Sequence, residues 1–288
     1  MYKIMFIAGG RRVSLAKVFE RQGFEVSSYE LDLQVPIATN HKVYTGLSWN
    51  DPNLEKDLKR TINDNCIDLA IPLDCKGVHL VCTTPFSAET CLDKTKLQTF
   101  MEINLSSWYP NPVYGKPCII KPRFGYGSNG IETNLSYHKG LENPETVVIQ
   151  NKLIGKEYSV DAYFNIKGEL VGASPRERLW VSGGEVLESI TINSENLVYM
   201  TKTIGEKIGL KATPACFQFI DDENGIPYLT EINARAGGGI LLSIESGLDV
   251  VEYIKNEYLD YKPINKDAVK IEKDVYMTRS FTDHFFRN

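Results

Sequence analysis

Three oxygen-bearing side chains in the second half of the chain are spaced as metal ligands would be. Glu231 and Asn233 lie two residues apart in an apolar run, so on a strand they point to the same face. A second apolar run at 215–220 and the Asn224-Gly225 turn between the runs predict a β-hairpin. Across that hairpin Gln218 falls on the same face. Such oxygens suit Mg²⁺, which binds a few protein oxygens together with substrate phosphates. The alternative is an edge hairpin with its polar face in water.

A glycine-rich segment in the middle of the chain has the composition of a phosphate-binding loop. Residues 125–130 read Gly-Tyr-Gly-Ser-Asn-Gly, and they follow an apolar run that contains Lys121. Alternate glycines let backbone N–H groups close over an anion because no Cβ blocks the approach. A lysine on a rigid strand supplies a point charge. Taken alone, the pattern also fits a glycine-rich hairpin with a solvated lysine.

The segment that follows has features of a purine and ribose site. An apolar strand at 147–150 runs into a short connection at 151–155, and Glu157 comes next. Bare backbone N–H and C=O groups in such a connection can face a purine edge, and the acid can accept both hydroxyls of a ribose. A surface turn with the common Gly-Lys-Glu sequence is the alternative.

Two arginines, Arg176 and Arg178, have the spacing to grip a carboxylate. They follow a predicted strand at 169–173 and share a face if the strand continues, but Pro175 predicts an interruption there. Two guanidiniums beside a break in the backbone suit the bidentate binding of a small anionic acid, such as an amino acid or another metabolite acid. The alternative is a solvated pair close to acidic neighbours.

The N-terminal part alternates between short apolar runs and amphipathic helices. This alternation predicts an α/β unit with a parallel sheet and right-handed crossovers. The expected elements are strands at 3–8, 24–31 and 67–73 and helices at 14–22 and 52–65.

The turn after the first strand raises an alternative function. A strand, Gly9-Gly10 and a helix invite a dinucleotide-binding interpretation, and hence a nicotinamide-dependent oxidoreductase. However, the turn lacks the GxGxxG spacing that lets a pyrophosphate approach the backbone. Arg11 and Arg12 in the same turn either cap a cleft or lie on the surface. Asp32 and Asp74 follow strands, where ligand groups often stand, although solvated acids occur there as readily.

Composition narrows the classes of protein further. The 288 residues include 32 Lys+Arg and 37 Asp+Glu, a net charge of −5, so we expect no broad electrostatic footprint for nucleic acid. No apolar stretch approaches the roughly 20 residues that span a bilayer, and the N-terminus lacks a signal-peptide pattern. Six cysteines without CxxC spacing predict reduced thiols. We therefore expect a cytoplasmic protein that has no membrane partner.

Taken in order, these motifs resemble the ATP-grasp superfamily, and most closely its carbamoyl-phosphate-synthase-like branch. The segments that match are Asp93-Lys94, 120–122, 125–130, 150–157, Gln218-Phe219 and 231–235. No single motif is specific, but the six in this order and spacing are, and the resemblance covers nearly the whole chain. It implies an α/β and α+β fold in which a Rossmann-like pre-ATP-grasp domain (1–92) precedes a two-lobed ATP-grasp module. The lobes would be a lid (93–152) and a catalytic subdomain with the C-terminal segment (153–288), with ATP between them.

The resemblance also implies roles for the matching residues. At the nucleotide, the expected ligands are Lys94 and Lys121 for the phosphates, Gly127 and Ser128 in the closing loop, the backbone of Asn151 and Leu153 for adenine, and Glu157 for ribose. At the reaction centre they are Gln218, Glu231 and Asn233 for the metal, Arg235 beside the transferred phosphate, and Arg176 and Arg178 near the acid substrate.

Three departures from the family pattern refine the expected activity. Gln218 stands where many relatives carry an acid, but the synthases themselves carry glutamine. Asn151 often corresponds to an acid, which matters little if the contact is through the backbone. The chain is also short, with a compressed segment at 106–115, and a single copy argues against carbamoyl phosphate synthesis.

The resemblance therefore implies a stand-alone, ADP-forming carboxylate–amine ligase. It would use ATP and Mg²⁺, with Mn²⁺ as an alternative, and join a small-molecule acid to an amine. A homodimer is compatible with it. The competing hypothesis is a nucleotide sensor or scaffold that keeps the fold without turnover.

Overall fold

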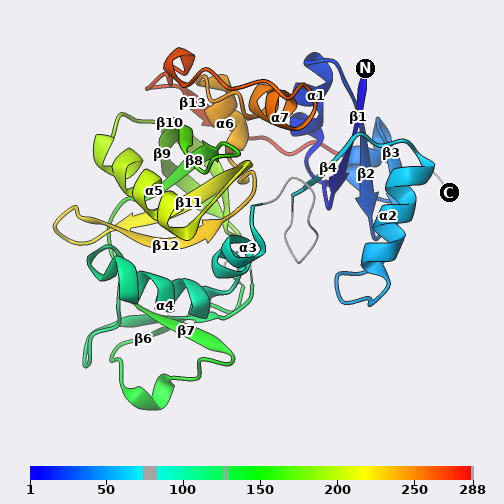
Figure 1. Ribbon diagram of the computed structural model, residues 1–288. Helices are drawn as coiled ribbons and strands as arrows, with labels where there is room; N and C mark the ends of the chain where they lie inside the picture. Colours follow the sequence, from blue (N-terminus) through cyan, green and yellow to red (C-terminus); the bar gives the residue numbers. More distant parts are fainter. Residues whose placement is uncertain (74–82, 126, 128, 287–288) are drawn as a thin grey trace.

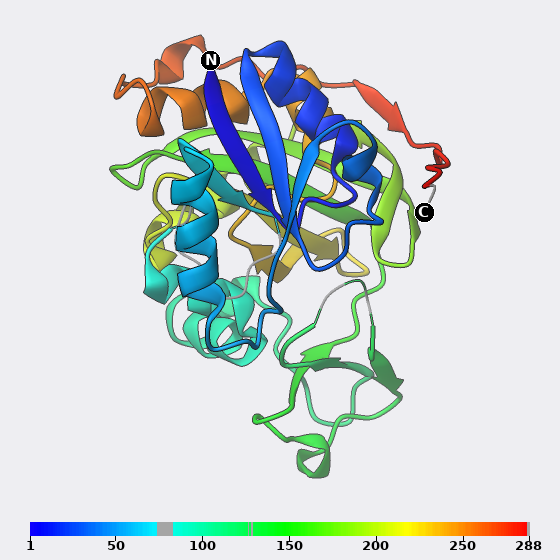
Figure 2. The same cartoon turned by 90° about the vertical axis from the view of Figure 1, so that its right-hand side faces the viewer.

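The chain forms three β-sheets in succession, as Figure 1 shows. The computed structural model describes residues 1–73, 83–125, 127 and 129–286. The first sheet is parallel, the second is small, and the third has six strands. After rotation by 90°, Figure 2 shows the small sheet projecting away from the rest of the molecule.

The first sheet has the strand order β3-β2-β1-β4 and is parallel throughout. Its elements are β1 (Tyr2–Ile7), α1 (Val13–Arg21), β2 (Phe24–Glu30), β3 (Lys42–Thr45), α2 (Leu54–Asp64) and β4 (Leu69–Pro72), with a 3₁₀ turn at Pro36–Thr39. The predicted alternation of strands and helices is therefore confirmed. The edge strand β3 was missed because it has four residues and none of them is buried.

The small sheet has the order β6-β5-β7 and carries the lysine-containing strand in its centre. Its strands are β5 (Cys118–Pro122), β6 (Glu132–Asn134) and β7 (Val147–Asn151), preceded by helices α3 (Pro85–Leu92) and α4 (Lys94–Asn104) and accompanied by 3₁₀ turns at Ser106–Trp108 and Lys139–Leu141. Helix α4 begins where Asp93 accepts hydrogen bonds from the backbone N–H groups of Thr95 and Lys96. This cap fixes Lys94 as the first residue of the helix.

The six-stranded sheet is antiparallel and has the order β12-β11-β8-β9-β10-β13. Its strands are β8 (Glu157–Phe164), β9 (Leu170–Ser182), β10 (Glu185–Thr191), β11 (Thr213–Asp221), β12 (Pro227–Asn233) and β13 (Tyr276–Thr278). One face is apolar, with Val160, Phe217 and Ile232 in a buried cluster that also includes residues of α5 (Glu195–Ile208). The period of two along each strand leaves the opposite face to the polar residues.

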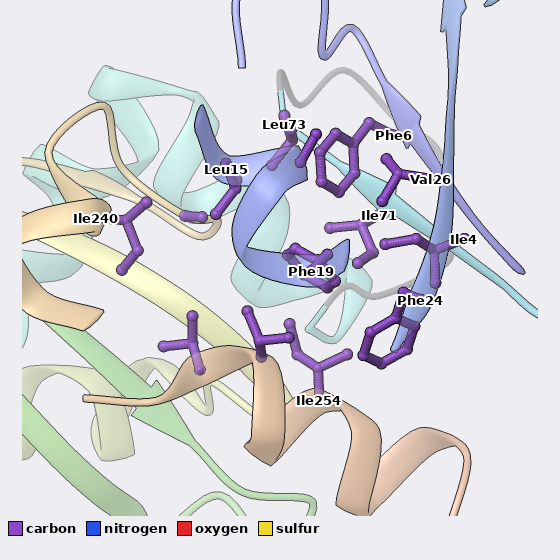
Figure 3. Close-up of a cluster of buried hydrophobic side chains, with 14 of the residues drawn as sticks. Ile4, Phe6, Leu15, Phe19, Phe24, Val26, Ile71, Leu73, Ile240 and Ile254 are labelled. Carbon is purple, nitrogen blue, oxygen red and sulfur yellow. The ribbon is translucent and has the colours of Figure 1, made fainter. Parts of the chain in front are cut away.

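A shared hydrophobic core joins the first sheet to the end of the chain. Helices α6 (Ile240–Glu245) and α7 (Val250–Tyr258), which come before a 3₁₀ turn at Lys266–Ala268, contribute Ile240 and Ile254 to the cluster that contains Phe6 and Phe19 (Figure 3). Burying such side chains stabilises by roughly 1.5–3 kcal/mol each. The first sheet is thereby anchored to the segment just after β12.

Two further properties bear on the expectations from sequence. Four thiols, those of Cys66, Cys91, Cys118 and Cys216, are free. Within the described ranges, no helix combines the length and apolar character that crossing a bilayer requires.

Candidate active site

Two rows of paired residues cross the polar face of the six-stranded sheet. In the first row Glu231 is opposite Gln218, Gln218 is opposite Ser159, and Ser159 is opposite Arg176. In the second row Asn233, Cys216, Asp161 and Ser174 are paired in the same way. Directly paired residues point to one face, so the predicted hairpin does bring Gln218, Glu231 and Asn233 together.

The three proposed metal ligands are held by local hydrogen bonds. Asn233 donates from Nδ2 to Oε1 of Glu231 at 3.1 Å, which leaves the Asn233 amide oxygen available. Gln218 accepts from Nη1 of Arg178 at 3.3 Å through Oε1. Over the described part of the chain, no group of three or more His, Cys, Asp and Glu side chains could hold a metal ion. A cation here would depend on one carboxylate, amide oxygens and substrate phosphates, a set that fits Mg²⁺.

Lys121 on β5 is buried among charges that come from three other segments. Only 8% of the residue is exposed. Burial lowers the pKa of its ammonium to about 8, the negative charges of Glu231 and Glu157 oppose this shift, and the positive charge of Lys94 adds to it. Four of the residues predicted to bind the nucleotide or metal therefore lie within electrostatic reach of one another.

Lys94 is held against the glycine-rich segment. Its Nζ donates to the carbonyl of Gly125 at 2.8 Å, and its residue is 9% exposed. The preceding Asp93 accepts from Nη2 of Arg123 at 2.7 Å. Burial alone would raise the pKa of Asp93, but hydrogen bonds from Arg123 and Thr95 lower it to about 2. Sequence reasoning missed Arg123, whose role depends on β5 ending beside the start of α4.

The glycine-rich segment touches the turn between β9 and β10. Of the two residues predicted in the closing loop, Ser128 lies outside the described residues and Gly127 lies against Gly184. A Cβ on Gly184 would stand 2.6 Å from the Cα of Gly127. Arg178 donates from Nη2 to the carbonyl of Gly184 at 3.2 Å. Arg178 thus links the glycine contact to Gln218.

The connection after β7 has the open backbone expected of a purine site only in part. The Asn151 N–H donates to the carbonyl of Pro110 at 2.7 Å, and its side chain accepts from the Val113 N–H at 3.3 Å. The Leu153 N–H has no hydrogen-bond partner within the described ranges. Glu157, at the start of β8, has its Oε2 3.8 Å from Nε of Arg178. Leu153 is accordingly the better candidate for a backbone contact.

The interruption expected at Pro175 is absent, so that prediction is wrong. Strand β9 runs through Pro175, which pairs with Val160 in β8, and its carbonyl accepts from the Ile192 N–H at 2.9 Å. Neighbouring strands on both sides override the local preference of proline. Arg176 and Arg178 therefore do share a face.

The two arginines nevertheless have different surroundings. Arg176 is 2% exposed and donates from Nε to Oδ2 of Asp161 at 2.9 Å, and Ser243 donates to the same oxygen at 2.7 Å. Cys216 lies in the same cluster, and burial raises the pKa of its thiol to about 12. Arg178 instead faces Gln218 and Glu157, two of the residues predicted to bind the metal and the nucleotide. Asp161 was missed because its pairing depends on strand register.

The segment after β12 turns back over this cluster. Arg235 donates from Nη1 to the carbonyl of Ala236 at 3.1 Å, and three glycines follow. A Cβ on Gly237 would meet Oδ1 of Asp161 at 2.9 Å, and one on Gly239 would meet Cζ of Arg176 at 2.4 Å. Glycine is required at both positions because the turn rests directly on the buried ion pair.

The first sheet does not present a free dinucleotide turn. Glu30, at the end of β2, accepts hydrogen bonds from the backbone N–H groups of Gly9 and Gly10 and from Ser28. Burial raises the pKa of Glu30, and these hydrogen bonds oppose the shift. The N–H groups that a pyrophosphate would need are therefore already engaged, which disfavours the oxidoreductase alternative.

Comparison with known proteins places this geometry in context. Residues 143–280 match a family model described as an ATP-grasp in the biosynthetic pathway with Ter operon. N5-carboxyaminoimidazole synthetase from Staphylococcus aureus complexed with ADP is 15% identical, with a TM-score of 0.70 over 92% of this chain and 78% of that chain. No curated protein sequence matches significantly.

Two further solved structures share the fold. Biotin carboxylase from Campylobacter jejuni, in a β,γ-ATP complex, is 14% identical with a TM-score of 0.66, covering 94% of this chain and 74% of that one. An L-amino acid ligase from Bacillus licheniformis is 15% identical with a TM-score of 0.65, covering 94% and 78%. At these identities the likeness is one of fold. Together with the family-model match over residues 143–280, it shows that this chain has the ATP-grasp fold.

Proposed function

We propose that this protein is an ADP-forming ligase that activates a small carboxylic acid with ATP and joins it to an amine. The observation that carries the proposal is the burial of Lys121 among Lys94, Glu157 and Glu231. A buried ammonium with a lowered pKa is costly to the fold, and a polyphosphate is a ligand that would restore its charge. The solved structures with this fold include an L-amino acid ligase and proteins bound to ADP or an ATP analogue, which supports the same class.

The reaction proceeds through an acylphosphate. A carboxylate oxygen of the acid attacks the γ-phosphorus of ATP, and the bond to the ADP oxygen breaks. The amine nitrogen then attacks the acyl carbon, phosphate leaves, and the nitrogen loses a proton. The protein contributes position and charge rather than a covalent intermediate of its own.

Each part of the site has a task in that scheme. Lys121 and Lys94 hold the phosphates, and the loop containing Gly127 excludes water from the acylphosphate. Glu157 accepts from ribose hydroxyls, and the N–H of Leu153 faces adenine. These assignments follow the resemblance, and the shared neighbourhood of Lys121, Lys94 and Glu157 supports them.

The metal ligands would be Glu231, Asn233 and Gln218. When bound, Mg²⁺ would neutralise phosphate charge and orient the γ-phosphate for attack. Glu231 supplies the only formal charge in this set, and its hydrogen bond from Asn233 at 3.1 Å fixes the carboxylate.

Arg235 follows the metal strand directly, so we assign it to the reacting carboxylate and transferred phosphate. Arg178 is assigned to the nucleotide and metal end, since it donates to Gln218 and Gly184 and lies 3.8 Å from Glu157. Arg176 supports the floor of the site through Asp161.

The proposal is tested by an acid screen with hydroxylamine as the amine. Hydroxylamine captures an acylphosphate as a hydroxamate, so the amine need not be known in advance. We expect ADP and hydroxamate to form in equal amounts with at least one acid, and only when Mg²⁺ is present. Tight ATP binding without ADP release for any acid would instead favour the sensor hypothesis.

A further inference from the structure

A buried ion pair joins the start of α4 to the end of β5 in the small sheet. Asp93, the N-cap of α4, is 3% exposed. Its Oδ1 and Oδ2 each accept from Nε of Arg123 at 3.0 Å, and Oδ2 also accepts from Nη2 at 2.7 Å. Oδ1 accepts in addition from the Thr95 N–H at 3.0 Å. One carboxylate therefore caps the helix and binds a guanidinium through both of its oxygens.

The backbone of Arg123 ties the same two elements together. Its carbonyl accepts from the Lys94 N–H at 3.2 Å, and its N–H donates to the carbonyl of Thr146 at 2.8 Å. The second of these bonds continues the pairing of β5 with β7, the strand that lies alongside α4 in Figure 1. Asp93 and Arg123 thus fix α4 against the small sheet through side chains and backbone at once.

This contact determines the positions of two buried lysines. Lys94 follows Asp93 directly, and its residue is 9% exposed. Lys121 stands two residues before Arg123 on β5 and is 8% exposed. Burial lowers the pKa of Lys121, and the positive charge of Lys94 lowers it further, so the two ammoniums repel each other. This repulsion favours separation of the lysines unless the start of α4 is held in place.

Stability alone does not account for a charged residue at position 93. Asparagine caps a helix as well as aspartate does, so the cap needs no charge. A buried ion pair is often no more stabilising than apolar side chains of similar volume, because both charges lose their hydration. Burial raises the pKa of Asp93, but hydrogen bonds from Arg123 and Thr95 lower it to about 2, so the pair stays charged at neutral pH. These points favour a role of the pair in placing its neighbours.

We propose that Asp93 and Arg123 form a positioning pair, which sets the distance between Lys94 and Lys121 and thereby the affinity for the phosphates of ATP. The inference rests on the nucleotide site of the proposed function. Two cations on separate elements bind one polyphosphate well only when their separation matches it, because each contact depends on geometry. The guanidinium of Arg123 is engaged by Asp93, so it acts through Lys94 rather than on the nucleotide.

The test compares the binding of ADP with the binding of adenosine, both measured by calorimetry. Adenosine carries no phosphate, so a change in the spacing of the lysines should leave its affinity unaltered. Asp93→Asn keeps the cap oxygen and removes the charge, and Arg123→Met keeps an apolar stem and removes the guanidinium. We expect either variant to weaken ADP binding by about 10-fold to 100-fold, as losing a charged hydrogen bond does, and to change adenosine binding by less than about 2-fold.

Glu145→Gln is the matched control, because it removes a second acid from Arg123. Nη1 of Arg123 lies 3.4 Å from Oε2 of Glu145, whose side chain is 87% exposed. An exposed pair of this kind contributes little, so the control should bind ADP as the wild type does. Should a single variant fail to fold, the double variant Asp93→Asn/Arg123→Met removes both charges and is measured in the same way.

A double-mutant cycle shows which residue transmits the effect. In a Lys94→Met background the nucleotide has already lost this lysine, so adding Arg123→Met should change the ADP affinity by less than about 2-fold. An undiminished loss in that background would show that Arg123 does not act through Lys94, and would overturn the proposal.

The remaining outcomes separate this inference from the proposed function. A loss confined to ADP supports the positioning pair even if no acid gives a hydroxamate, a result that would count against the ligase alone. Equal losses for ADP and adenosine would overturn the positioning role, because a general loosening of the fold would then explain them. Unchanged ADP binding in Asp93→Asn and Arg123→Met would also overturn it and leave the ligase standing. A wild-type protein that binds no ADP would overturn both.

Discussion

Gly184 in the β9–β10 turn lies against Gly127 of the glycine-rich segment, and a Cβ on Gly184 would stand 2.6 Å from both the Cα and the carbonyl carbon of Gly127. Contact of this kind with backbone cannot be relieved by a rotamer change. The carbonyl of Gly184 also accepts from Arg178 at 3.2 Å. The side chain of Arg178 therefore connects the contact between the glycine-rich segment and the β9–β10 turn to Gln218.

Gly184→Ala should prevent the glycine-rich segment from packing against the β9–β10 turn. We therefore expect the rate of ligation to fall by on the order of 10-fold to 100-fold. Hydrolysis of the acylphosphate should rise because water enters the site. The measurement is the ratio of hydroxamate to ADP. Gly183→Ala is the matched control, since Gly183 also has positive φ (+55°) but a Cβ there would meet nothing within 4 Å. Equal losses in both variants would show that backbone strain, rather than the contact, is responsible.

Glu231→Gln keeps the size of the side chain and removes the only formal charge among the three proposed metal ligands. We expect Mg²⁺-dependent turnover to fall by about 10²-fold or more, as for other transition-state charge contacts, while the melting temperature changes little. Glu223→Gln, in the exposed turn of the same hairpin, should retain wild-type activity. Near-normal turnover of Glu231→Gln would remove Glu231 from the site.

Lys121 predicts a proton uptake that accompanies ATP binding. Its pKa is about 8, below the ordinary 10.5, mainly because it is buried. Above pH 8 the free protein therefore loses this charge, and phosphate binding must restore it. At pH 8.5 calorimetry in two buffers of different ionisation enthalpy should report net uptake of a proton. Lys121→Arg, which stays charged, should abolish the uptake; its absence in the wild type would contradict the placement of Lys121 at the phosphates.

The lowered pKa of Lys121 also makes the free energy of unfolding depend on pH. Between about pH 8 and 10.5 the unfolded chain binds this proton and the folded chain does not, so raising the pH through that window relieves the penalty for burying Lys121 and increases the free energy of unfolding. Below pH 8 the lysine is charged in both states, and the full penalty for burying it remains.

The hairpin that carries Gln218, Glu231 and Asn233 was predictable because local signals determine it: two apolar runs, an Asn-Gly turn and a spacing of two. Pro175 misled because a residue preference is weak beside hydrogen-bonded strands on both sides. The pairing of Arg123 with Asp93, 30 residues earlier, depends on where β5 ends beside α4, which no local pattern encodes.

Asp161 and Arg176 form a buried ion pair, and Arg176 is one of the two arginines that the sequence predicts near the acid substrate. Asp161→Asn would leave the guanidinium without its counter-charge in a region where Arg176 is 2% exposed, so the free energy of unfolding should fall by about 3–5 kcal/mol. Glu89→Gln, which removes an exposed partner of Lys96, should change it little. The double variant Asp161→Asn/Arg176→Met removes both charges and should recover most of the loss. Urea denaturation measures the stability of all three. If Arg176 only supports the turn, the double variant should also keep a KM for the acid close to that of the wild type, because the net charge of the site is unchanged. A stable double variant with a large rise in the KM for the acid would instead show that Arg176 binds the acid substrate.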